Sequence, residues 1–62
     1  MQYKKMMILI IDDSYLIIER LTDMLKEHEN IGDIMHALSG NDAIEILESR
    51  TPDVILLDIN LP

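Results

Sequence analysis

The sequence predicts an α/β fold with a parallel sheet, formed in the order β-α-β-α-β. Two short apolar runs, at residues 6–11 and 54–57, have the length and composition of strands covered on both faces. Two helical patterns lie between them, separated by a weaker apolar segment at residues 34–38. Strands that alternate with helices indicate βαβ units. With 62 residues, the chain forms one small domain at most.

The first strand, at residues 6–11, is followed by capping chemistry and then by a helical pattern. Ser14 can cap a helix, and the acids before it suit the helix dipole. The side chains that recur at three- and four-residue spacing are those of Ile17, Leu21, Met24, Leu25 and His28. We therefore predict a helix over residues 15–28.

The middle of the chain predicts a connection at residues 30–33, which contains Gly32, and then a second strand at residues 34–38. His36 interrupts that strand, which suits an edge position. The turn at residues 39–41 can cap a short helix that ends near Ser49. Pro52 begins a new segment, and Asp53 is predicted to be a turn acid ahead of the strand at residues 54–57.

Two strand orders are compatible with right-handed crossovers. Both helices on one face would give the order 1-2-3, and one helix on each face would give 2-1-3. We favour 2-1-3, because it places the two most apolar strands side by side and the weak second strand at an edge. It also creates a topological switch point between strands one and three, where open α/β sheets bind ligands.

Composition excludes several classes of function. The net charge of −7 disfavours nucleic acid and anionic membrane as direct partners. No apolar run approaches the roughly 20 residues of a membrane span. The chain has no cysteine, so it can form neither a disulfide nor a zinc–thiolate site. The lack of cysteine also fits a cytoplasmic location, which we expect for this chain.

Three acids mark the candidate site. Asp12 and Asp13 follow the first strand directly, and Asp58 follows the third. Carboxylates at the ends of neighbouring parallel strands converge and repel one another, which implies a bound cation or unusual proton chemistry. The alternatives are a plain helix start at residues 12–14 and a strand-terminating turn at Asp58. We expect His28 and His36 to be solvated or edge residues, because neither has a partner at a ligand spacing.

Three motifs carry a family resemblance: ILIIDDS at residues 8–14, ALSGNDA at 37–43 and PDVILLDINLP at 52–62. Together they resemble the receiver domains of response regulators in two-component signalling. The resemblance implies the N-terminal portion, truncated before strand four, of a flavodoxin-like doubly wound parallel sheet, spanning residues 1–62. It implies Asp58 as phospho-acceptor from a sensor histidine kinase or phosphotransfer protein. It also implies Mg²⁺ held by Asp13, by Asp12 mainly through water, by one oxygen of Asp58 and by the backbone carbonyl of Asn60.

The resemblance also sets expectations about activity. The family's Ser or Thr after strand four and its Lys after strand five have no counterpart in residues 1–62. We therefore expect the chain by itself to hold no stable aspartyl phosphate. We also expect that the chain is not an enzyme, and that a parent receiver would catalyse only its own aspartyl phosphorylation and dephosphorylation. That parent would signal to an output domain or downstream effector. The alternative is a half-domain that self-associates, as a homodimer through the strand at residues 54–57, and signals nothing.

Overall fold

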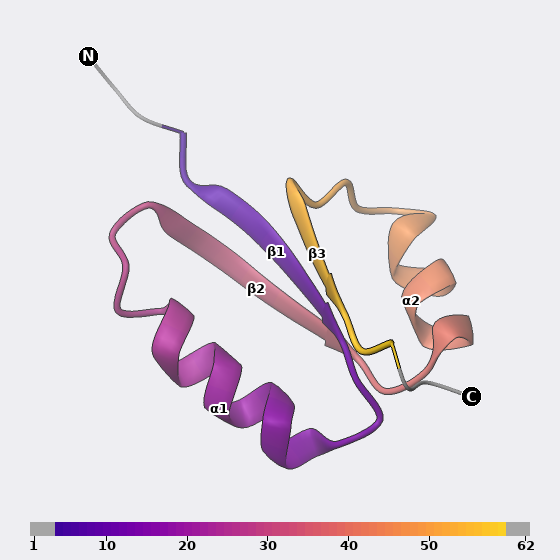
Figure 1. Ribbon diagram of the computed structural model, residues 1–62. Coiled ribbons are helices and arrows are strands. Elements are labelled where there is room, and N and C mark those ends of the chain that lie inside the picture. Colours follow the sequence, from indigo (N-terminus) through magenta and orange to yellow (C-terminus); the bar gives the residue numbers. More distant parts are fainter. Residues whose placement is uncertain (1–3, 60–62) are drawn as a thin grey trace.

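The computed structural model describes residues 4–59 and contains three strands and two helices in the predicted alternation. They are β1 (Met6–Ile11), α1 (Tyr15–Leu25), β2 (Ile31–Ala37), α2 (Gly40–Leu47) and β3 (Val54–Leu57). Figure 1 shows the sheet with one helix to either side of it. Within the described part of the chain, no helix is both long enough and apolar enough to cross a membrane.

The sheet is parallel and has the order β2-β1-β3, so the predicted 2-1-3 order is confirmed. Strand β1 is central and pairs with β2 on one side and with β3 on the other. Its last four residues, 8–11, are all buried. A central strand with both faces covered needs an uninterrupted apolar run, which explains the composition of this segment.

Alternate residues of β1 separate two small cores, because successive side chains of a strand point to opposite faces. Ile8 and Ile10 pack with Ile18 of α1 on one face. Leu9 and Ile11 pack with Ala43 of α2 on the other. The helices therefore cover opposite faces of the sheet, as a doubly wound fold requires.

The second strand begins at Ile31, three residues earlier than predicted, so the prediction of a connection at residues 30–33 was wrong. Met6 pairs with Ile31 and Ile8 with Ile34, so the register shifts between these two pairs and Gly32 lies at the irregularity. A Cβ built at Gly32 would lie 3.0 Å from the Cβ of Lys5. This glycine therefore permits β2 to approach the residue that precedes β1 closely, a use that sequence alone does not distinguish from a turn.

Helix α1 ends at Leu25, whereas the sequence predicted an end near His28. The His28 N–H donates to the Leu25 carbonyl at 3.0 Å, and the Ile31 N–H donates to the His28 carbonyl at 3.1 Å. These turn contacts lead the chain directly into β2. The buried side chain of α1 is Ile18, while the predicted core residues Ile17 and Met24 are 39% and 66% exposed.

Both predicted helix caps are confirmed. The Ser14 hydroxyl accepts the Ile17 N–H at 3.4 Å, and the Ser39 hydroxyl accepts the Asp42 N–H at 3.1 Å. Each serine satisfies one of the N–H groups that the first turn of a helix leaves without an internal partner. Ser14 thus starts α1 directly after the two acids at the end of β1.

Candidate functional site

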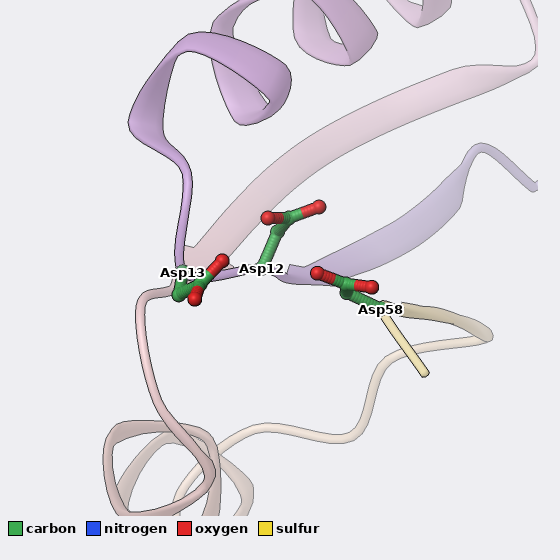
Figure 2. Close-up of side chains that lie close together, drawn as sticks. All are labelled: Asp12, Asp13 and Asp58. Atoms are coloured by element: carbon green, nitrogen blue, oxygen red, sulfur yellow. The ribbon is translucent and has the colours of Figure 1, made fainter. Parts of the chain in front are cut away.

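The structure brings Asp58 close to Asp12 and Asp13, which are distant from it in sequence. Asp12, Asp13 and Asp58 each offer a carboxylate oxygen, and these oxygens all lie within 4.8 Å of one another. Asp12 and Asp58 are half-buried, and Asp13 is exposed. Figure 2 shows the three side chains at the carboxyl end of the sheet, where β1 and β3 finish side by side. The predicted convergence of these residues is therefore present in the structure.

The backbone of the sheet fixes where two of the acids start. The Asp12 N–H donates to the carbonyl of Ala37, the last residue of β2, at 3.1 Å. The Asp58 N–H donates to the carbonyl of Ile11, the last residue of β1, at 2.9 Å. Each acid therefore lies one residue beyond its strand while its peptide still continues the ladder. Rigid strand ends position a site more accurately than a long loop does.

A tight turn orients the Asp12 side chain. Its Oδ1 accepts the Ser14 N–H at 2.9 Å, which is the local bond by which aspartates stabilise turns. The same Ser14 caps α1, so the turn and the helix start form one continuous unit. Asp13 lies between Asp12 and Ser14 in this turn, and its carboxylate is the exposed member of the cluster.

The donor set fits a hard divalent cation. Mg²⁺ prefers oxygen ligands at about 2.0–2.1 Å and keeps several waters, so two direct ligands span at most about 4.2 Å. The three carboxylate oxygens lie within 4.8 Å of one another, a spacing at which the acids could share one ion directly or through its waters. A depression of about 130 Å³, lined by Asp12, Asp58 and apolar residues of β1, α1 and β3, adjoins the acids. Asn60, the fourth predicted ligand, lies outside the described residues.

Asp53 does more than the predicted turn acid, because it bonds to β1 through both its backbone and its side chain. The Asp53 N–H donates to the Met7 carbonyl at 2.8 Å, and its Oδ2 accepts the Met7 N–H at 2.8 Å. The Met7 N–H and the Lys4 ammonium, whose Nζ lies 3.6 Å from Oδ1, keep the pKa of the Asp53 carboxyl below its ordinary value of 3.8. The only available signal was an acid placed directly before a strand, which is also typical of turns.

The two histidines are exposed, as predicted. The ring of His36, on the edge strand β2, makes a T-shaped contact with the ring of Tyr15, with centroids 5.5 Å apart and planes at 88°. Neither histidine belongs to the cluster formed by the three acids. The site within the described residues is therefore built from carboxylates.

Comparison with known proteins assigns the family. The chain belongs to the response regulator receiver domain family, whose model matches residues 8–62. This finding confirms the family that the three sequence motifs indicated. No solved structure gives a significant match to the chain.

The curated relatives include proteins named protein-glutamate methylesterase/protein-glutamine glutaminase. One from Clostridium acetobutylicum is 39% identical over 59 residues, which are 95% of this chain and 17% of that protein. One from Caldanaerobacter subterraneus subsp. tengcongensis is 41% identical over 59 residues, or 95% of this chain and 16% of that protein. A third, from Rhodospirillum rubrum, is 46% identical over 55 residues, or 89% of this chain and 15% of that protein. The chain thus spans about one-sixth of the length of these relatives.

Proposed function

We propose that Asp58 accepts a phosphoryl group from a phosphohistidine on a sensor histidine kinase or phosphotransfer protein. The observation that carries this proposal is the convergence of three carboxylates within 4.8 Å at the end of β1 and β3 in a receiver-family chain. A carboxylate oxygen of Asp58 would attack phosphorus, forming an acyl phosphate. The P–N bond of the donor would break, and the leaving imidazole would take up a proton.

Asp12, Asp13 and Asp58 are the residues that would hold Mg²⁺, with the Asn60 carbonyl as a further proposed ligand. Bound there, the ion would offset negative charge on the phosphoryl group and on the acids around it. The chain's own residues supply position. The turn at Asp12 orients one carboxylate, and the end of the sheet holds the Asp58 backbone against β1.

We propose that the chain acts on no separate substrate. We propose that it is not an enzyme in the usual sense, and that a parent receiver would catalyse only its own aspartyl phosphorylation and dephosphorylation. Residues 1–62 do not include the hydroxyl that the family places after strand four or the lysine that it places after strand five. We therefore expect any phosphoryl group on this chain by itself to be short-lived.

The experiment that tests the acceptor must detect a transient acyl phosphate. The chain is incubated with acetyl phosphate and MgCl₂, and borohydride then reduces any acyl phosphate to the alcohol. We expect mass spectrometry of the digest to find homoserine in place of Asp58. Asp58→Asn is the control, and Glu45→Gln removes an acid of α2 while leaving Asp58 and Asp53 unchanged. Equal modification of another acid in the Asp58→Asn protein would contradict the assignment.

The output of such a signal is also a proposal. The relatives named protein-glutamate methylesterase/protein-glutamine glutaminase are far longer than the region they share with this chain. We propose that phosphorylation at Asp58 controls an attached output domain or a downstream effector, and an esterase or amidase acting on protein side chains is the class that these relatives suggest. We place the protein in the cytoplasm, where such kinases present their phosphohistidines.

One observation favours a second function, self-association as a homodimer through β3. Among residues 4–59, β3 pairs with β1 alone, and Ile55 and Leu57 are 46% and 60% exposed. An unpaired apolar edge favours pairing with another chain. Light scattering after size-exclusion chromatography should then report a dimer that Ile55→Lys dissociates. Ile44→Lys, at an exposed apolar position of α2, is the matched control, and a monomer at micromolar concentration contradicts the pairing.

A further inference from the structure

The side chains of β3 specify its register only weakly. The strand has four residues, Val54–Leu57, all of them apolar. A slip of one residue would exchange the two faces of the strand, but both faces present similar apolar side chains. The same slip would move Asp58 by about 3.3 Å along the sheet. A shift of that size is comparable with the spacing of the three acids, so the site needs another determinant of register.

Asp53 supplies contacts that define one register. Its N–H donates to the Met7 carbonyl and its Oδ2 accepts the Met7 N–H, both at 2.8 Å. The carboxylate therefore takes the place of a main-chain carbonyl that would otherwise continue the parallel ladder. At the other end of β3, the Asp58 N–H donates to Ile11 at 2.9 Å. The four-residue strand is thus held to β1 at both ends.

These contacts discriminate against a slip in either direction. Moving Pro52 into the position of Asp53 would remove the donor, since proline has no backbone N–H. Moving Val54 into that position would remove the carboxylate acceptor. In both cases a backbone group of Met7 would lose the partner it now has. Only the observed register satisfies both groups.

Neighbouring charges hold the same end of the sheet. Lys4 pairs with the second carboxylate oxygen of Asp53, Oδ1, at 3.6 Å. Arg50, in the connection that leads to β3, pairs with Asp33 of β2 at 3.1 Å, and its guanidinium nitrogen lies 3.9 Å from the Met7 sulfur. The segment before β3 is therefore tied to both β1 and β2.

We propose that Asp53 is a positioning residue that sets the register of β3 and thereby places Asp58 beside Asp12 and Asp13. Its consequence for the metal site rests on the proposed function. The register itself is measurable without that function, through the protection of the Asp58 amide from hydrogen exchange and through cross-strand nuclear Overhauser effects between β1 and β3.

The test compares Asp53→Ala with three other variants by NMR, first without metal and then in a titration with MgCl₂. Asp53→Asn keeps an oxygen that can accept the Met7 N–H. Asp53→Glu keeps the charge but displaces the carboxylate by one methylene. Ser39→Ala is the matched control, because it also removes one side-chain acceptor of a backbone N–H, at the start of α2 and outside β3.

We expect Asp53→Ala to lose protection of the Asp58 amide and to bind Mg²⁺ on the order of 10–100-fold more weakly, as loss of a group that orients a metal ligand typically does. Asp53→Asn should bind more tightly than Asp53→Ala, and Asp53→Glu more weakly than Asp53→Asn. Ser39→Ala should keep the affinity of the unmodified protein although it is less stable.

Equal Mg²⁺ affinity and equal Asp58 protection in Asp53→Ala and Ser39→Ala would overturn the proposal. If Asp53→Ala does not fold, Asp53→Glu is the deciding variant. A Mg²⁺ affinity and an Asp58 amide protection equal to those of Asp53→Asn would then overturn the proposal. If the unmodified protein binds no Mg²⁺, the proposed metal site is wrong. The Asp58 amide and the cross-strand contacts then still decide whether Asp53 sets the register.

Discussion

Removing one charge from the acid cluster should stabilise the metal-free protein. Asp13→Asn is the best perturbation, because Asp13 is exposed and the change is nearly isosteric. Replacing Asp12 would also disturb the turn in which its carboxylate accepts the Ser14 N–H. Replacing Asp58 would remove the proposed phosphoryl acceptor. Asp13→Asn removes two of the three pairwise repulsions and leaves the turn at Asp12 and the acceptor Asp58 in place.

The size of the effect follows from the geometry. Unit charges 4.8 Å apart repel by about 0.9 kcal/mol at the dielectric constant of water and by about 3.5 kcal/mol at an effective dielectric constant of 20. Physiological salt, with a Debye length of about 8 Å, reduces the lower figure to roughly 0.5 kcal/mol for each pair. Relief of two pairs therefore gives at least about 1 kcal/mol, which raises Tm by about 4–8 °C in a domain of this size.

Thermal melts in EDTA and in MgCl₂ test this prediction. In EDTA, Asp13→Asn should melt above the unmodified protein. In Mg²⁺ the order of the two melting temperatures should reverse, or the difference between them should disappear. The reason is that Mg²⁺ at 100 times Kd adds about 2.7 kcal/mol to the free energy of unfolding of the protein that keeps all its ligands. Glu45→Gln makes the same change of net charge on α2 and should show neither effect. An Asp13→Asn protein that melts at or below the unmodified one in EDTA would refute the convergence of the three charges.

Three further changes test the fold. Leu9→Ala, at a side chain with 0% exposure, should cost about 2–5 kcal/mol and leave little folded protein in a urea titration monitored by circular dichroism. Ser14→Ala should cost about 0.5–2 kcal/mol by removing the cap of α1, and Ser14→Gly should cost less, whereas equal losses would exclude capping as the cause. The pKa of Asp53 is lowered in the folded state, so its contribution is complete above 3.8 and is lost as the pH falls below that value. The free energy of unfolding should therefore differ more between the unmodified protein and Asp53→Asn at about pH 6 than at about pH 3. A difference independent of pH would contradict a lowered pKa of Asp53 in the folded state.

The predictable part of the fold is the part that its apolar pattern determines by itself. The continuous runs of β1 and β3 have one reasonable interpretation, and both strands have the predicted bounds. The strand order followed from comparing apolar strength between strands. The inner face of α1 could not be predicted from the apolar pattern, because Ile17 and Ile18 are both apolar and only tertiary packing decides which one turns inward. Gly32 misled the prediction, since glycine serves turns and close strand contacts alike.

The candidate site divides in the same way. Asp12, Asp13 and Asp58 could be predicted because a parallel sheet brings the carboxyl ends of its strands to one edge, whatever the details of packing. The role of Asp53 could not be predicted, because it depends on which carbonyl and which N–H of β1 lie opposite it. That pairing is a consequence of register, and register is the property of β3 that its apolar side chains leave open.

Two opposing effects therefore act on the two ends of one short strand. At its carboxyl end, we expect the acids, which lie within 4.8 Å of one another, to repel one another and to destabilise the metal-free sheet. At its amino end, Asp53 holds the strand to Met7 through two backbone groups and pairs with Lys4. A strand held at the end remote from its charged site can tolerate repulsion there without losing its register. A cation or a phosphoryl group arriving at Asp58 would then change the electrostatics of one end alone.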